Sequence, residues 1–358
     1  MHRIATLLIV GTGLFAGACS DSSGTRGAAR DLEPAPGEAA RLEASADAQS
    51  AGSPGALCPT SPKRAKEPAL FGEGVVSTAD FDSHPALTPD LSRLYFLRST
   101  PNFRFWTILV SERRGRRWGA PEVAPFSGQW SDADPFITED GGKLYFISKR
   151  PGGLDPGPHP ETNDIWVMDR RGDGWTAPVN VGAKVNSTAS EWYPTVARNG
   201  TIYFGSDRPG GRGRTDLYRA RWENGHYGEP ENLGDAVNTA FDEYEPYIAP
   251  DESYLVFMAA RADGVGGYDL YLSLQENGRF TQAKNLGAPI NSPGNELSPK
   301  LSPDGKTFFW TSARSFVDAP LDKPMNYRTL SERLHGPGNG LGDIYCIDAS
   351  VLGLPPHT

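Results

Sequence analysis

A unit of about 50 residues recurs five times along this chain, and this repeat constrains the fold more than any other feature of the sequence. Each unit opens with an acidic residue three positions before a proline. Successive prolines lie 50, 59, 52 and 53 residues apart. Repetition at such a period is typical of equal units that bury their apolar faces against their neighbours. The five pairs are Asp82 and Pro85, Asp132 and Pro135, Glu191 and Pro194, Glu243 and Pro246, and Glu296 and Pro299.

Two further motifs predict β-strands, the first in all five units and the second in four of them. Gly-rich turns such as Ser302-Pro303-Asp304-Gly305 separate them, as in antiparallel hairpins. Four short strands in about 50 residues make one propeller blade, so the sequence predicts an all-β, five-bladed β-propeller. The first motif is an apolar triplet: Leu94-Tyr95-Phe96, Leu144-Tyr145-Phe146, Ile202-Tyr203-Phe204, Leu255-Val256-Phe257 and Phe308-Phe309-Trp310. The second is an Asp-apolar-aromatic triplet: Asp164-Ile165-Trp166, Asp216-Leu217-Tyr218, Asp269-Leu270-Tyr271 and Asp343-Ile344-Tyr345.

The composition agrees with this architecture and excludes several others. The 358 residues include 41 Gly and 31 Pro. These residues cost about 1 and 3 kcal/mol in helix interiors, which excludes a helical bundle. The formal net charge of −9 argues against a nucleic-acid partner, because such binding depends on Lys and Arg that neutralise phosphates. Three cysteines are too few for a disulfide-dense scaffold or a Cys-rich zinc site.

The first residues are typical of a signal peptide. His2 and Arg3 precede an apolar run over 4–15, which is too short to span a bilayer comfortably. The small residues 16–18 before Cys19 resemble the lipobox of bacterial lipoproteins, with plain secretion as the alternative. The resemblance implies a signal peptide over 1–18 and acylation of Cys19. It also implies localisation to the cell envelope, on the periplasmic face of the outer membrane, because Ser20 follows the cysteine.

Residues 19–67 contain no aromatic residue and no periodic apolar pattern. A segment rich in Ala, Gly, Ser, Pro and Glu cannot bury enough apolar surface to offset chain entropy. The sequence therefore predicts a disordered tether over 19–67 and a propeller over 68–354.

The repeats resemble the WD40-like β-propeller repeat of the TolB-type family, and the resemblance covers residues 70–354. Members of that family often have six blades, which is the alternative to the five counted here. The last unit stops after its third strand, while Phe71–Ser77 resembles the inter-blade segment Asn232–Asn238. We therefore expect the N-terminal segment to supply the missing outer strand and close the ring. Cys58 and Cys346 fall near this closure, either as a disulfide or as two free thiols.

One face of the propeller is expected to carry the acidic residues and the Arg-Pro-Gly-Gly loops. In the first blade the aligned positions hold Thr100 and Thr107, so both partners are lost together. This joint loss predicts an Arg–Asp pair that braces each loop in the other blades. The expected pairs are Arg150 with Asp164, Arg208 with Asp216, Arg261 with Asp269, and Arg314 with Asp343.

The five acidic residues are expected to converge around the mouth of the central channel, where they could bind a basic peptide or Ca²⁺. The alternative is that each caps its own strand by accepting backbone N–H bonds. A second candidate contact surface is the insertion Ser315–Gly342, which includes a predicted helix near Tyr327–Leu334. Long loops in compact domains are usually functional or disordered, so this insertion is either a docking element or an inert surface feature.

Motifs for catalysis are sparse. The six histidines show no metal-ligand spacing, and no Gly-x-Ser-x-Gly elbow occurs. Prolyl-oligopeptidase-like enzymes share this propeller but add a hydrolase domain, which is not expected after the last blade. The segment Ser302-Pro303-Asp304-Gly305 does not match the boxes of sialidase propellers. His84, beside Asp82, is the one residue that favours an enzyme.

The sequence therefore predicts a non-catalytic envelope lipoprotein whose TolB-like propeller is a protein-binding or scaffold module. The expected partner is an envelope protein or peptide, bound by a monomer that contacts the membrane only through its lipid anchor. No cofactor and no metal are expected, apart from the Ca²⁺ considered for the acidic ring. The alternative is a carbohydrate-active hydrolase or lyase with its site at the pore mouth.

Overall fold

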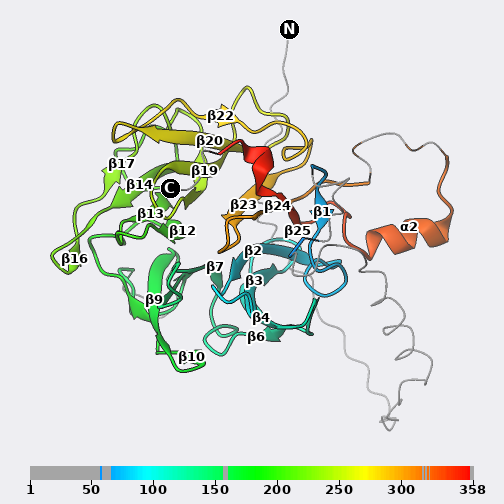
Figure 1. Ribbon diagram of the computed structural model, residues 1–358, viewed down its shortest axis with the longest axis horizontal. Coiled ribbons are helices and arrows are strands. Elements are labelled where there is room, and N and C mark those ends of the chain that lie inside the picture. Colours follow the sequence, from blue (N-terminus) through cyan, green and yellow to red (C-terminus); the bar gives the residue numbers. More distant parts are fainter. Residues whose placement is uncertain are drawn as a thin grey trace, which may run out of the picture. The chain divides into compact units, whose positions relative to one another are not determined.

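A computed structural model describes residues 57–58, 66–155, 160–316, 318, 321 and 323–354. These residues form a β-propeller of five blades arranged in a ring (Figure 1), as the repeat predicts. The predicted signal peptide, Cys19 and nearly all of the predicted tether lie outside the described residues. No helix within the described part is long and apolar enough to cross a membrane.

Each blade is an antiparallel sheet, and the first strands of neighbouring blades contact one another in a closed circle around the axis. Blade 1 contains β2 (Phe81–Leu87), β3 (Arg93–Ser99), β4 (Trp106–Arg114), β5 (Arg117–Trp118) and β6 (Glu122–Val123). Blade 2 contains β7 (Asp132–Ile137), β8 (Lys143–Ser148), β9 (Asp164–Arg171), β10 (Gly174–Trp175) and β11 (Val179–Asn180). Blade 3 contains β12 (Glu191–Val196), β13 (Ile202–Ser206), β14 (Asp216–Ala220), β15 (Trp222–Glu223), β16 (His226–Tyr227) and β17 (Glu231–Asn232).

Blades 4 and 5 follow the same plan. Blade 4 contains β18 (Glu243–Ile248), β19 (Tyr254–Ala259), β20 (Asp269–Glu276), β21 (Arg279–Phe280) and β22 (Lys284–Asn285). Blade 5 contains β23 (Glu296–Leu301), β24 (Thr307–Ser312), β25 (Asp343–Asp348) and, from the other end of the chain, β1 (Ala69–Leu70). The short helices are α2 (Tyr327–Leu334) and the 3-10 helix η3 (Ala349–Leu352).

The ring closes through the N-terminal segment, as predicted. Ala69 pairs with Cys346 and Leu70 with Tyr345, so β1 is the outer strand of blade 5. Ser77 then clamps the backbone of Ile344, donating to its carbonyl and accepting from its N–H. In blade 3, Asn238 makes the same two bonds to Leu217. A disulfide joins Cys58 to Cys346 and fastens the N-terminal segment to β25.

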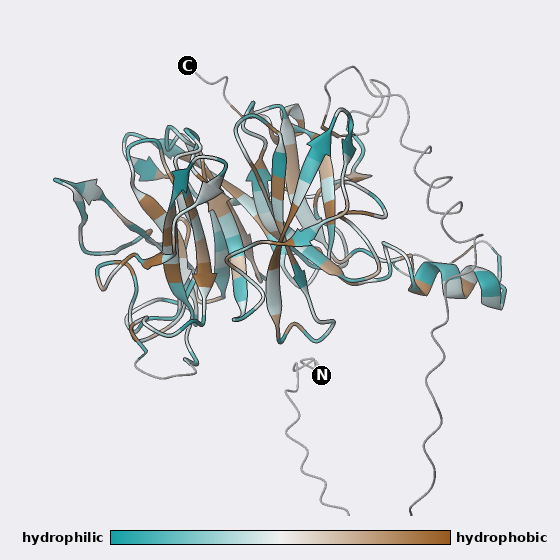
Figure 2. Ribbon diagram, turned by 90° about the horizontal axis from the view of Figure 1, so that it is seen from below, coloured by the Kyte–Doolittle hydropathy of each residue, from teal (hydrophilic) through white to brown (hydrophobic). Residues whose placement is uncertain are grey.

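The core lies between neighbouring blades. The apolar triplets are buried; Leu94 and Phe96, for example, are 0% exposed. Figure 2 shows the hydrophobic residues in the middle of the blade strands, while α2 is mostly hydrophilic. The predicted helix forms as α2 with no buried residue, and the Asn326 side chain caps it by accepting from the N–H of Thr329. Residues 317, 319, 320 and 322 of the insertion lie outside the described residues.

Candidate functional site

The acidic residues that open the repeats are buried inside their own blades. Each is 0% exposed: Asp82, Asp132, Glu191, Glu243 and Glu296. Glu243 accepts the N–H of Thr239 at 3.0 Å and its hydroxyl at 2.6 Å, and three of the others accept the same pair of bonds. Asp132 accepts the hydroxyl of Ser127 instead. These carboxylates therefore form no exposed ring at the channel mouth, and the capping alternative describes four of the five.

In blades 2 to 5 each of these carboxylates lies beside the arginine that follows the second strand of its own blade. Arg150 contacts Asp132 at 2.8 Å and Arg208 contacts Glu191 at 2.9 Å. Arg261 contacts Glu243 at 3.1 Å, and Arg314 lies 3.9 Å from Glu296. Blade 1 keeps the pair through Arg98, whose Nε lies 2.7 Å from Asp82. The prediction that these arginines pair with the third-strand aspartates is wrong. Asp132 and Asp164 both lie opposite Ser148 in the sheet, but Arg150 contacts Asp132, while Asp164 bonds to its own loop.

The third-strand aspartates brace the loops without an arginine. Asp164 accepts the backbone N–H of Leu154 and the side-chain amide of Asn180. Asp216 and Asp269 make the corresponding bonds to their own loops and to Asn232 and Asn285. Asp343 accepts the N–H of Gly338, which belongs to the insertion. The bracing role is thus present, with backbone N–H groups as the donors.

A second set of five residues, here called the axial ring, lies two positions after the buried acids. Each residue precedes the repeat proline, sits at a β-bulge and has φ between +46° and +57°. Non-glycine residues adopt such φ values at a cost of about 1–3 kcal/mol, and such positions cluster at functional sites. The axial ring consists of His84, Asp134, Tyr193, Glu245 and Ser298.

Three members of the axial ring converge from blades 1, 2 and 4. Nε2 of His84 lies 3.0 Å from Oδ1 of Asp134 and 3.2 Å from Oε1 of Glu245. Nδ1 of His84 lies 2.6 Å from the hydroxyl of Ser83. The His84 side chain is 2% exposed and the Glu245 side chain 14%, so Glu245 is the member most open to solvent.

Backbone groups of the other two members hold the carboxylates in place. The N–H of Tyr193 donates to Oδ2 of Asp134 at 2.8 Å, and the N–H of Ser298 donates to Oε2 of Glu245. Burial on its own would lower the pKa of His84, but Glu245 and Asp134 outweigh it and raise the pKa to about 9. At neutral pH His84 is therefore an imidazolium between two carboxyl groups.

A buried lysine lies beside this cluster. Lys300 of β23 places Nζ 4.7 Å from the ring centre of Phe136, 4.6 Å from Tyr193 and 5.7 Å from Tyr247. Nζ has no hydrogen-bond partner among the described residues. Burial lowers the pKa of Lys300 to about 7, against the opposing influence of Asp134 and Glu245. Lys300 also lines a small cavity of about 70 Å³.

Aromatic side chains extend beside the carboxylates. Ring centres lie 4.8 Å apart for Phe81 and Phe103, 5.5 Å for Phe103 and Trp106, and 6.2 Å for Trp106 and Trp192. Trp106 and Trp192 pack against the apolar cluster that contains Ala133, the neighbour of Asp134 in the sequence. Phe103, 38% exposed, is the most open ring of this row.

The described residues contain no group of three or more His, Cys, Asp or Glu arranged to hold a metal ion. The buried acids already accept backbone, hydroxyl and arginine donors, so they offer no set of free oxygens of the kind that Ca²⁺ needs.

Solved structures with a similar arrangement include an α-L-arabinofuranosidase from Lactobacillus brevis, at 13% identity over 77% of this chain and 92% of that one, TM-score 0.45. A thermostable family-43 glycoside hydrolase matches at 12% identity over 77% and 91% of the two chains, TM-score 0.47. GH43B from a Bacteroides ovatus xyloglucan locus matches at 14% identity over 69% and 51%, TM-score 0.42. No protein-family model matches the chain, and no curated protein matches it.

The predictions that the chain is a non-catalytic scaffold and that it is not an enzyme find no support in this comparison, in which glycoside hydrolases recur. It also gives no support to a TolB-type family beyond the propeller itself. At these identities the likeness shows the fold alone. An activity must therefore be argued from this chain's own residues.

Sequence reasoning found His84 but missed its partners Asp134 and Glu245. The signal was present: the residue immediately before each repeat proline occupies one position in all five blades. It was overlooked because its identity differs between blades, whereas the neighbouring acid is repeated.

Proposed function

We propose that this protein is a carbohydrate-active hydrolase whose site is the cluster of His84, Asp134 and Glu245. The observation that carries the proposal is the convergence of two carboxyl groups from different blades at the propeller axis. Glycoside hydrolysis commonly uses a pair of carboxyl groups, one as the acid that protonates the leaving oxygen. The buried acids occur in every blade, whereas a carboxyl group at the axial-ring position occurs only in blades 2 and 4.

The roles follow from exposure and contacts. Glu245, the most open of the three, protonates the leaving oxygen, and Asp134 is the second carboxyl group. Their nearest oxygens are at most 6.2 Å apart, since they lie 3.2 and 3.0 Å from the same nitrogen of His84. Carboxyl groups of inverting enzymes are about 6.5–9.5 Å apart and those of retaining enzymes about 5–5.5 Å, so the spacing favours retention. His84 acts as a positioning residue, because Nε2 contacts both carboxyl groups.

The aromatic row supports binding of a sugar at this place. Ring faces carry negative potential and attract the polarised C–H groups of a pyranose or furanose ring. Trp106 and Trp192 lie next to the Asp134 strand, so a sugar stacked there would lie near the carboxyl groups.

The test is to assay the full chain on aryl glycosides and on plant and envelope polysaccharides, and to compare Glu245→Gln and Asp134→Asn. Each variant should lose about 10²–10⁴-fold in kcat, the usual contribution of acid–base groups. Glu112→Gln is the matched control, because Glu112 is an exposed carboxyl group that pairs with Arg93 in blade 1 and belongs to neither the axial ring nor the cluster. Turnover that both variants retain, or no turnover of any glycan by the parent chain, would overturn the proposal.

We also propose that the protein is a lipoprotein of the WD40-like repeat type, anchored through Cys19 at the outer membrane. The small residues before Cys19 and the apolar run support this proposal. Expression in a Gram-negative host with radioactive palmitate should label the parent chain but not Cys19→Ser. Equal labelling of both chains would contradict the anchor.

A further inference from the structure

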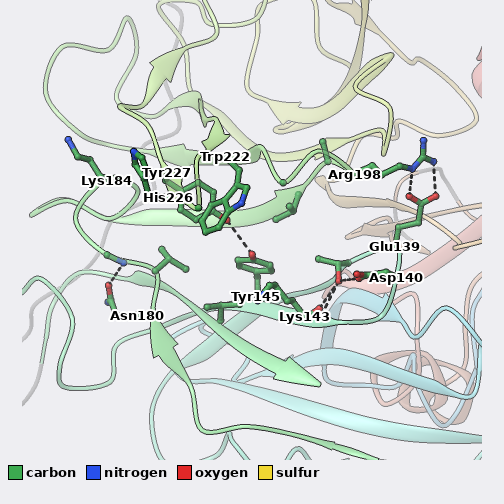
Figure 3. Close-up of a pocket in the computed structure, with 18 of the residues that line it drawn as sticks. Glu139, Asp140, Lys143, Tyr145, Asn180, Lys184, Arg198, Trp222, His226 and Tyr227 are labelled. Carbon is green, nitrogen blue, oxygen red and sulfur yellow. Dashed lines mark hydrogen bonds and ion pairs between the residues drawn. The ribbon is translucent and has the colours of Figure 1, made fainter. Parts of the chain in front are cut away.

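A cleft of about 610 Å³ lies between blades 2 and 3, away from the axial ring (Figure 3). Tyr145 of β8, Trp222 of β15 and Tyr227 of β16 line it, and none of the axial ring residues does. Ligand sites for small molecules commonly have about 300–1,000 Å³ and combine aromatic walls with a few polar groups. A similar cleft of about 570 Å³ lies between blades 1 and 2, so the space itself comes from the repeat.

Trp222 distinguishes the cleft of blade 3 from the rest of the repeat. An outer hairpin in blades 1 to 4 places an aromatic residue opposite one cross-strand partner. In three of these blades the partner is polar: Arg113 pairs with Trp118, Arg170 with Trp175, and Gln275 with Phe280. In blade 3 the corresponding pair is Trp222 and Tyr227, and Trp222 is 46% exposed. Since three blades fold with a polar residue there, the propeller does not require this indole.

The indole is held in place rather than left free. A Cβ on Gly200 would lie 2.9 Å from the Cβ of Trp222, so only glycine allows the close approach, and its φ of +87° is itself unfavourable for other residues. The ring centres of Trp222 and Tyr227 lie 4.7 Å apart in an edge-to-face arrangement. The Tyr227 hydroxyl in turn lies 3.2 Å from that of Tyr145. In Figure 3 the three rings lie together in the cleft.

The cations on the rim of the cleft already have acidic partners. Arg198 holds Glu139 through two bonds, at 2.8 and 2.9 Å. Lys143 pairs with Asp169 and Lys184 with Glu229. An anionic ligand would have to displace these carboxylates, whereas a neutral ligand with hydroxyl groups can bond to both members of each pair. The rim therefore favours an uncharged polar ligand over an anion.

We propose that this cleft is an accessory binding site for a sugar ring of a neutral oligosaccharide, with the ring stacked on Trp222 and its hydroxyl groups bonded to the rim. The preformed aromatic face lowers the ordering cost of binding. The choice of a carbohydrate as ligand rests on the proposed function, but the site shares no residue with the catalytic cluster. The cleft would hold either a part of a long glycan that is distant from the catalytic cluster or a second glycan chain.

The experiment uses the full chain with Glu245→Gln, so that glycans are not consumed, and titrates it with neutral xylo-, arabino-, cello- and malto-oligosaccharides by calorimetry and tryptophan fluorescence. Adding Trp222→Arg, which copies blade 2, should weaken binding of the responsive oligosaccharide at least tenfold or remove one binding site from the stoichiometry. Trp222→Arg alone should leave kcat on a small aryl glycoside unchanged. Arg170→Ala in the neighbouring hairpin is the matched control and should bind as the parent does.

The two proposals fail separately. Oligosaccharide binding that depends on Trp222 in a chain without hydrolytic activity would overturn the proposed function and support the accessory site. Affinity and stoichiometry that Trp222→Arg leaves unchanged, or no binding of any of the four oligosaccharides, would overturn the accessory site. Loss of hydrolysis in Glu245→Gln would support the proposed function whatever result Trp222→Arg gives.

Discussion

The buried acids and the axial ring lie only two positions apart in each repeat, and they differ in the contacts that they make. The buried acids, represented by Glu243, repeat in every blade and bond only within their own blade and its loop. The axial ring, represented by Glu245, differs in every blade, and its members bond to one another across blades. In a symmetric repeat, a residue type that occurs in every blade stabilises the blade. A position whose residue differs between blades can instead contribute to a functional site.

The largest difference between the rings should be in stability. Glu243→Ala leaves the Arg261 guanidinium, 7% exposed, without its carboxylate, and such an unpaired buried charge costs about 3–5 kcal/mol. Glu245→Ala should cost less, about 1–3 kcal/mol, because His84 keeps Asp134 as a partner while the buried N–H of Ser298 loses its acceptor. Urea unfolding of the two variants measures both values. Equal losses would show that the two rings have the same structural role.

A double variant sharpens this result. Replacing both members, as in Glu243→Leu with Arg261→Met, removes the uncompensated charge and should recover part of the loss. If the double variant is no more stable than Glu243→Ala, the capping bonds to Thr239 account for the effect rather than the ion pair.

The axial ring should have its own pH dependence. The pKa of His84 is about 9 in the folded chain against 6.5 as its ordinary value, so its contribution is fully present below pH 6.5 and is lost as pH rises through about 9. The shift corresponds to about 3 kcal/mol. We expect the stability difference between the parent and His84→Asn to shrink by that order between pH 6 and 9.5 in urea unfolding.

The groups facing His84 are Asp134, Glu245 and Tyr193, with Lys300 close to both carboxylates. As pH rises from 7 to 10.5, Lys300 changes the free energy of unfolding in the opposite direction to His84. Taking the difference between the parent and His84→Asn cancels the contribution of Lys300. A difference that does not depend on pH would mean that His84 carries no charge between its carboxylates.

The smallest expected effect is a gain in stability. The Lys300 amine is buried without a hydrogen-bond partner, so Lys300→Met should stabilise the fold by about 1–3 kcal/mol near pH 7. Because the pKa of Lys300 is lowered to about 7, the folded chain resists protonation, and the gain should shrink as pH rises toward 10.5. Thermal unfolding at pH 7 and pH 10 checks both. A loss of stability at pH 7 would show that the contacts with Phe136 and Tyr193 outweigh burial.

Much of the fold was predictable from local patterns. The proline spacing and the apolar triplets predicted five blades, because each pattern repeats within about 50 residues. The missing outer strand of the last unit predicted closure by the N-terminal segment, at the opposite end of the chain. The pairing of Arg150 was not predictable in this way. Asp132 and Asp164 both lie opposite Ser148 in the sheet, and only the side-chain contacts decide that Arg150 pairs with Asp132 while Asp164 bonds to Leu154.

The sequence by itself determined the repeat, the blade and the position of one acid in each first strand, since these depend on residue types at a regular spacing. It left open whether those acids cap their strands or line the channel mouth. Only the tertiary structure decided that His84 meets Glu245, 161 positions away, and that Trp222 faces a cleft where other blades place a polar residue. The physical reason is closure: residues of separate blades come together only when the ring forms, so no single repeat contains the site.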